Sequence, residues 1–377
     1  QQLGDGVVRT IAMGSSDGMT YAPVGAPAPV VAQGEFVVAA VHLDHGHIHG
    51  MCRGLQEAGA TIGPVYDPDP AKVAAFLGAF PGARPVDDLE RVLGEPGVHL
   101  VAAAAVPAER GPLGVRVMLA GKDYFTDKAP FTSLAQLADA REAVAATGRK
   151  YMVYYSERLH VESAVHAGAL IADGVIGKVL HVLGTGPHRL NATARPEWFF
   201  SKERYGGILC DIGSHQVEQF LHFAGVEDAR VSHARVANLA HPHYPELEDF
   251  GEAALEADDG SGAYFRVDWL TPDGLSVWGD GRTFIVGDKG TMELRKYTDV
   301  GRSSEADQLF LVTAEGETRL SLRGKVGFPF FGALILDCLE RTERAMTQAH
   351  AFKAAELSLV AQELADRSWR GRTDRPA

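Results

Sequence analysis

The chain has 377 residues, of which 46% are hydrophobic and 23% charged, a composition typical of a soluble globular protein long enough for two domains. Its 36 basic and 49 acidic residues give a formal net charge of −13, so we expect its surface to repel nucleic acid and anionic membranes. Three cysteines, Cys52, Cys210 and Cys338, are too few for a disulfide framework, and no apolar run is long enough for a membrane span. These features favour the cytoplasm, although the start at Gln1 leaves a removed signal as an alternative.

The first 155 residues divide into an arm and an alternating region. Residues 1–34 are rich in Pro, Gly and Ala, and we expect an extended arm that packs on the body or reaches a neighbouring subunit. From residue 35 to 155, strand-like segments at 35–43, 60–67, 98–106, 123–130 and 150–156 alternate with helix-like segments at 49–59, 70–80, 112–121 and 133–148. This alternation indicates a parallel, doubly wound sheet of the Rossmann type, so we assign residues 35–155 to a dinucleotide-binding domain.

After residue 155 the pattern changes to helices and successive strands. Two helical stretches cover 160–174 and 207–225, and a third covers 331–369. The strand-like segments are 178–186, 229–240, 251–257, 262–270, 282–288, 290–297 and 307–314. Strands in sequence with turn residues between them suggest a mostly antiparallel sheet, so we assign residues 156–377 to a second, α+β domain.

The stretch HLDHGHIHG, residues 42–50, stands where a dinucleotide fold places its glycine-rich turn. Such a turn brings backbone N–H groups at a helix N-terminus against the pyrophosphate. Alignment of the strand end puts the three glycine positions of G-x-G-x-x-G on His42, Asp44 and His47, with Gly46 between the last two. The glycine motif itself is therefore not matched.

Asp67 supports a dinucleotide nevertheless. It ends the second predicted strand, roughly 20 residues beyond the turn. A dinucleotide fold places the acid that hydrogen-bonds the ribose at about this point. An acid at this point would repel the 2′-phosphate of NADP, which favours NAD. Asp67 could also be the N-cap of the helix that follows Pro70, and the two roles are compatible.

The histidines of the turn have other interpretations. His45 and His49 are four residues apart and could bind a metal, with His47 or His42 as a third ligand. However, no Cys or Glu stands nearby, and ligands at i, i+2 and i+4 of a helix point in different directions. A further alternative is that the imidazoles only hydrogen-bond around the turn. We favour NAD contact through backbone amides and histidine side chains of the turn, with no metal, and the candidate residues are His42, Asp44, His45, Gly46 and His47.

A second group of polar residues lies further along the chain. Lys128 and Pro130 follow the strand in GKDYFTDKAP, at the carboxyl end where a doubly wound sheet binds its ligand. Asp211 and His215 are four residues apart in YGGILCDIGSHQVEQF and share one helix face. An Asp–His pair is suited to proton transfer. Taken singly, the lysine could be solvated and the histidine an ordinary helix residue.

Together, the segments DKAP, SERLH, GVIGKVL and YGGILCDIGSHQVEQF resemble the Gfo/Idh/MocA oxidoreductases, over about residues 35–370. The resemblance implies an NAD-binding domain, a substrate-binding domain whose open sheet forms the contact of a homodimer or homotetramer, and a sugar as partner. It implies that Lys128 is the catalytic lysine and that Asp211 and His215 are the D-x-x-x-H pair, with His215 as proton acceptor. It adds Pro107 and Lys128 to the cofactor contacts. Ala129 before the proline and the missing glycines depart from the family pattern.

The sequence therefore predicts an NAD-dependent oxidoreductase that oxidises a ring hydroxyl of a sugar, sugar derivative or cyclitol. A second hypothesis is a redox-neutral NAD-dependent glycosidase, acting on an anionic glycoside such as a sulfoquinovoside or uronide. A third is a non-catalytic NAD-binding sensor. The candidate substrate contacts are Arg158, His188, Arg189, Arg195, Trp198 and Tyr205, and Tyr154 and Tyr155 are spare acid–base groups.

Overall fold

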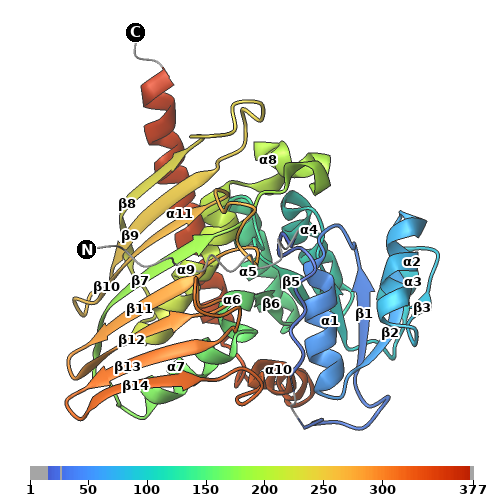
Figure 1. Ribbon diagram of the computed structural model, residues 1–377. Helices are drawn as coiled ribbons and strands as arrows, with labels where there is room; N and C mark the ends of the chain where they lie inside the picture. The colour runs from blue at the N-terminus through green and yellow to red at the C-terminus, as the bar shows by residue number, and fades with distance from the viewer. Residues whose placement is uncertain (1–15, 26–27, 374–377) are drawn as a thin grey trace.

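The computed structural model describes residues 16–25 and 28–373, and it contains two β-sheets with helices between and around them (Figure 1). The six-stranded sheet has the order β3-β2-β1-β4-β5-β6, and its neighbouring strands are all parallel. Its strands are β1 Val37–Val41, β2 Thr61–Tyr66, β3 Arg84–Pro85, β4 Leu100–Ala103, β5 Asp123–Asp127 and β6 Tyr151–Tyr154. Its helices are α1 His47–Glu57, α2 Pro70–Ala79, α3 Leu89–Gly94, α4 Pro107–Leu119 and α5 Leu134–Thr147. The predicted Rossmann-type sheet is confirmed.

The eight-stranded sheet has the order β14-β13-β12-β11-β7-β10-β9-β8, and its neighbours pair antiparallel except β7 and β10. Its strands are β7 Val179–Pro187, β8 Arg230–Ala237, β9 Phe250–Glu256, β10 Gly262–Asp268, β11 Arg282–Gly287, β12 Gly290–Arg295, β13 Gln308–Thr313 and β14 Gly316–Ser321. The accompanying helices are α6 Ser156–Leu159, α7 Glu162–Ala172, η1 Ala192–Ala194, η2 Glu197–Phe200, α8 Lys202–Tyr205, α9 Ile208–Ala224, α10 Pro329–Glu340 and α11 Gln348–Thr373. Helix α9 lies against β7 and β10, and α11 packs on α9 (Figure 1). The mostly antiparallel sheet predicted for the second half is confirmed.

Several local predictions differ from the structure. Helix α4 begins at Pro107 rather than at residue 112, because proline suits the first helical position, where its missing N–H has no partner to lose. The C-terminal helical stretch is broken at Arg341, which caps α10 in the left-handed conformation with φ of +58°. The strands β3 and β14 and the helix α3 have no predicted counterpart, since β3 and α3 are too short to show a period.

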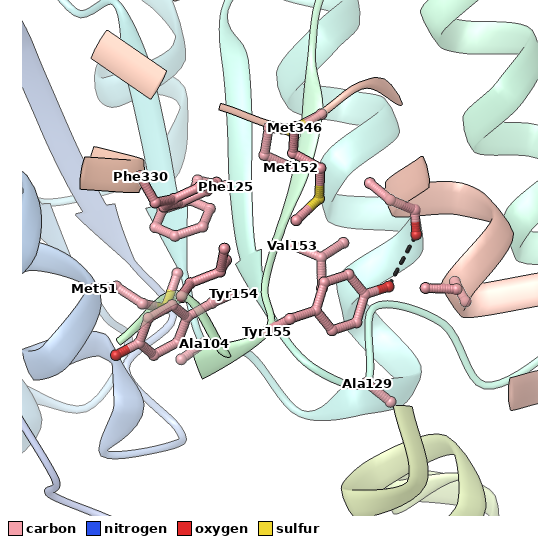
Figure 2. Packing of buried hydrophobic residues seen from close by; sticks show 14 of the residues in the cluster. Met51, Ala104, Phe125, Ala129, Met152, Val153, Tyr154, Tyr155, Phe330 and Met346 are labelled. Carbon is pink, nitrogen blue, oxygen red and sulfur yellow. Dashed lines mark hydrogen bonds between the residues drawn. The ribbon is translucent and has the colours of Figure 1, made fainter. Parts of the chain in front are cut away.

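The core joins the C-terminal helices to the first sheet (Figure 2). Phe125 of β5 lies 5.9 Å from Phe330 of α10, between ring centroids. The Tyr155 hydroxyl donates to the carbonyl oxygen of Ala351 on α11 at 2.9 Å, and the Tyr154 hydroxyl lies 2.5 Å from Nδ1 of His160. Burial raises the pKa of both tyrosines well above the usual value. Both hydroxyls therefore form hydrogen bonds inside the core. This disagrees with the prediction that Tyr154 and Tyr155 are spare acid–base groups of the active site.

The predicted division at residues 155 and 156 falls between β6 and α6, but α10 and α11 return to the first sheet, so this division stays a prediction. Of the predicted arm, residues 16–25 and 28–34 contain no helix or strand, while residues 1–15 and 26–27 lie outside the described part. Among the helices that are described, none is both long and apolar enough to cross a bilayer.

Candidate active site

A buried pocket, which we call the central pocket, lies where the carboxyl end of β5 meets the start of α9. Lys128 follows β5, and its Nζ atom lies 2.5 Å from Oδ1 of Asp211 on the first turn of α9. His215, one turn further along α9, lines the same pocket. The structure thus brings together the three residues that the sequence predicts as catalytic. Asp211 bonds to Lys128, however, rather than to His215 as an Asp–His pair would.

His215 is buried and carries an unsatisfied ring nitrogen. Its Nδ1 has no hydrogen-bond partner within the described residues, and its side chain is only 2% exposed. Burial, helped by the charge of Lys128, lowers the pKa of His215 well below 6.5, so the imidazole is neutral and can accept a proton. A buried polar atom without a partner costs about 1–3 kcal/mol, which indicates that a bound group completes the site.

A second acid–base pair lies in the same pocket. Nε2 of His188 lies 3.7 Å from Oε1 of Glu157, an oxygen that has no hydrogen-bond partner in the described part of the chain. Oε2 of Glu157 accepts from Gln216 at 3.0 Å and lies 3.6 Å from Nζ of Lys296. Burial raises the pKa of Glu157, Lys296 opposes this in part, and burial lowers the pKa of His188 to about 3. Sequence reasoning missed Glu157 and Lys296, although Glu157 stands in the SERLH segment.

The histidine turn has the backbone of a dinucleotide turn without its glycines. His42 has φ of +50°, the left-handed conformation that glycine adopts most easily, at the first of the three aligned positions. Helix α1 begins at His47, and its N-cap, Gly46, provides no side-chain cap. Instead, the backbone N–H of His47 donates to Nδ1 of His45 at 3.1 Å, and both histidines line the central pocket beside the positive end of α1.

His45, His47 and Asp127 lie close enough to hold a cation. The two imidazole Nδ1 atoms are 3.5 Å and 3.0 Å from the carboxylate of Asp127, while His49 instead packs against the aromatic rings of α2. Burial alone would raise the pKa of Asp127, but His47 and the buried guanidinium of Arg110 hold it well below its usual range. Because Arg110 already balances this carboxylate, the geometry favours a hydrogen-bonded cluster. The expectation of no metal stays a prediction.

Asp67 supports the turn directly. Its Oδ2 accepts from the backbone N–H of Leu43 at 2.7 Å, and its Oδ1 accepts from that of Asp69 at 2.8 Å. Helix α2 is capped by Asp69, so the N-cap alternative for Asp67 is wrong. Asp44 forms an ion pair of 2.7 Å with Lys72 of α2.

Two of the predicted arginine contacts have other partners. Arg158 forms a buried ion pair with Glu218, at 2.8 Å and 2.9 Å from Nε to the two carboxylate oxygens, and does not line the central pocket. Arg189 donates to the carbonyl oxygens of Ser16 and Leu275. The structure therefore places Arg158 and Arg189 in protein contacts rather than on an open substrate surface.

The remaining four predicted substrate contacts differ in whether they line the central pocket. Arg195 and His188 line the central pocket, but Arg195 donates to backbone carbonyl oxygens. The Tyr205 hydroxyl is held between the carbonyl oxygen of Glu246 and the N–H of Glu248, outside this pocket. Trp198 is buried beside Phe199. Of the six candidates, His188 is the one whose side chain is presented to the pocket in an acid–base pair.

Comparison with known proteins shows what most of this chain resembles. The model of the GFO/IDH/MocA C-terminal domain matches residues 165–293. A crystal structure described as that of an oxidoreductase from Erwinia carotovora atroseptica SCRI1043 has a TM-score of 0.85 and 48% sequence identity, covering 88% of this chain and 98% of that chain.

Two curated relatives match more distantly. D-xylose dehydrogenase of Paenarthrobacter nicotinovorans is 27% identical over 51% of this chain and 49% of its own length. The scyllo-inositol 2-dehydrogenase (NAD(+)) of Bacillus subtilis (strain 168) is 26% identical over 55% of this chain and 58% of its own length. The chain thus spans about half the length of these relatives. With the two-sheet fold, the matched C-terminal domain and the chain-long likeness together, the chain belongs to the Gfo/Idh/MocA family.

Proposed function

We propose that this chain is an NAD-dependent oxidoreductase that oxidises a ring hydroxyl of a sugar, sugar derivative or cyclitol. The proposal rests chiefly on three buried polar atoms that lack partners within the described residues: Nδ1 of His215, Oε1 of Glu157 and Nε1 of Trp269. All three residues line the central pocket beside Lys128. A polyhydroxylated ring offers several donors and acceptors at once, which is what such a set requires. The named activities of the two curated relatives support the same substrate class.

The histidine turn and the end of β2 fit NAD. The positive end of α1, with His45 and His47 beside it, favours a pyrophosphate, and the left-handed backbone at His42 gives the turn its shape. Asp67 supplies a carboxylate at the end of β2, which disfavours a 2′-phosphate. The residues that would hold NAD are His42, Asp44, His45, Gly46, His47, Asp67, Pro107 and Lys128. NAD supplies the hydride acceptor.

The side chains of the central pocket have distinct roles in this reaction. His215, neutral because of its burial, accepts the proton of the substrate hydroxyl. Lys128 stabilises the negative charge that develops on the oxygen as the proton leaves. Asp211 holds Lys128 in position through their 2.5 Å contact. Lys128 and His215 are buried, which excludes bulk water from the reacting hydroxyl, while Asp211 is partly exposed.

Alanine substitution of Lys128 and of His215 tests these roles. Each variant should lose on the order of 10²–10⁴-fold in kcat, with a much smaller change in the Kd of NADH. Lys178→Ala and His233→Ala, which alter exposed side chains of the second sheet, are the matched controls. Turnover at the wild-type rate in either central-pocket variant would refute the assignment.

The glycosidase remains a second candidate because of one observation, the His188–Glu157 pair. Elimination of an aglycone after oxidation needs a further base and acid, and this pair lies in the same pocket. To separate the two reactions, the enzyme would be mixed with trace NAD and a panel of free sugars and aryl glycosides. NADH that grows with a free sugar supports the dehydrogenase, and aglycone release without NADH supports the glycosidase. NAD binding without any reaction would favour the non-catalytic sensor.

A further inference from the structure

Residues 16–21, which we call the strap, form one wall of the central pocket. Asp17, Gly18, Met19 and Tyr21 line it together with the acid–base groups. The strap contains no helix or strand and precedes β1 by several residues (Figure 1). The volume left in the pocket is about 30 Å³, which holds one or two water molecules and no sugar ring. The strap must therefore shift when a sugar binds.

Two buried arginines hold the strap by its backbone. Arg189 donates to the carbonyl oxygen of Ser16 at 2.6 Å, and Arg195 donates to that of Asp17 at 3.1 Å. The guanidinium of Arg195 also lies 4.9 Å from the ring centre of Trp269. Hydrogen bonds from a charged donor are stronger than neutral ones, so these contacts fix one end of the strap over the pocket.

The other end of the strap lies against α1. A Cβ atom added to Gly46 would stand 2.1 Å from the carbonyl oxygen of Met19, and one added to Gly50 would stand 2.9 Å from that of Tyr21. Gly46 has φ of −62° and ψ of −14°, which any residue can adopt. Glycine at this position therefore provides room for the strap rather than backbone freedom.

Tyr21 separates the central pocket from a larger cavity. Its ring lies 4.4 Å from that of Trp278 and 5.8 Å from that of Tyr297, and the three aromatic residues line both spaces. The outer cavity has a volume of about 350 Å³, within the usual range for a small-molecule site. Displacement of Tyr21 would join the two spaces and leave room for a sugar beside Lys128.

We infer that Tyr21 is a gate that determines substrate specificity. Its side chain moves to admit the sugar and limits the size of a substituent on the sugar ring. The inference rests on the proposed sugar oxidation and adds to it the residue that selects the substrate. In the intact enzyme the gate favours a single unsubstituted ring. Without the Tyr21 side chain, the outer cavity accepts a ring that carries an alkyl or aryl group.

The kinetic test compares Tyr21→Ala with Tyr21→Phe and with Thr20→Ala, a change of an exposed strap residue that lines neither space. The ratio of kcat/KM for a free sugar to that for its alkyl glycoside should fall about tenfold or more in Tyr21→Ala, a difference typical of a reshaped pocket. The Tyr21→Phe and Thr20→Ala variants should keep the wild-type ratio, and the Kd of NADH should stay within about twofold. An unchanged ratio in Tyr21→Ala, or an equal shift in the Kd of NADH, overturns the inference.

Hydrogen exchange separates failure of the gate from failure of the proposed reaction. The backbone amides of residues 16–25 are followed in the full chain with NADH, with and without the sugar panel. Sugar that alters exchange in this segment without any oxidation in the activity assay supports the gate and refutes the reaction. Oxidation without a change in exchange or in the specificity ratio supports the reaction and refutes the gate.

Discussion

Arg158, which the sequence suggests as an anchor for an anionic sugar, is in the structure half of a buried ion pair. Its Nε lies 2.8 Å and 2.9 Å from the carboxylate oxygens of Glu218, and this carboxylate also lies 2.8 Å from Nε2 of His350. Glu218 is fully buried. Burial would raise the pKa of Glu218, but the charge of Arg158 holds it far below the usual range. The carboxylate therefore depends on Arg158 to remain charged inside the protein.

Replacement of Arg158 by methionine leaves Glu218 buried, with His350 as its remaining hydrogen-bond partner among the described residues. Loss of one partner of a buried pair costs about 3–5 kcal/mol, so the free energy of unfolding should fall by that amount. The double variant Arg158→Met, Glu218→Met removes the uncompensated charge as well, and it should recover most of the loss. Arg230→Met, which breaks an exposed pair with Glu256, should cost about 1 kcal/mol or less.

Urea unfolding followed by circular dichroism measures these values, and sugar oxidation measured on the same samples gives KM. The structural role predicts a lower unfolding free energy for Arg158→Met and, at temperatures where the variant is folded, a KM close to wild type. A KM that rises tenfold or more while the unfolding free energy is unchanged would refute the structural role of Arg158. It would indicate instead that Arg158 contacts the substrate.

Two further predictions concern charge. Burial lowers the pKa of His160 from 6.5 to about 3, so the unfolded chain binds a proton that the folded chain excludes, and stability falls as the pH drops below 6.5. At pH 5 this costs about 2 kcal/mol, and His160→Gln should remove that much of the pH dependence of urea unfolding; equal slopes in His160→Gln and wild type would contradict this. Asp67→Asn keeps an acceptor for the N–H of Leu43 but removes the negative charge. NADP should then gain about tenfold in affinity relative to NAD, as measured by fluorescence titration of the reduced forms, and an unchanged ratio would place the ribose elsewhere.

The features that sequence predicted well are those set by local patterns. The alternation of apolar strands and helices fixes the first sheet, because each segment must bury one face against its neighbour. Lys128 stands at a strand end and His215 on a helix face, and the carboxyl edge of the sheet brings such positions together. The domain limits came from the change of pattern near residue 155, and they stay a prediction, as do the roles of the candidate site residues.

The features that sequence missed are contacts between distant segments. Lys128 and Asp211 are 83 residues apart, and Arg158 and Glu218 are 60 apart. No period or spacing distinguishes an arginine that meets a buried carboxylate from one that meets a substrate. The strap is a similar case, because its Pro- and Gly-rich surroundings indicate only an extended segment and give no sign of where that segment packs.

The charges around the central pocket favour a neutral substrate over an anionic one. Lys128 is paired with Asp211, and Glu157 lies beside Lys296, so these cations are already balanced. Burial lowers the pKa of His188 and His215, which leaves both rings uncharged near neutral pH.

A carboxylate or sulfonate on the sugar would therefore need Arg195, which would have to release the carbonyl oxygen of Asp17 and with it one end of the strap. A neutral ring meets no such cost. Its hydroxyls can bond to Nδ1 of His215, Oε1 of Glu157 and Nε1 of Trp269 while both arginines keep their hydrogen bonds to Ser16 and Asp17 and the Tyr21 end of the strap shifts. The same contacts that remove the arginines from substrate binding thus point to an uncharged sugar or cyclitol.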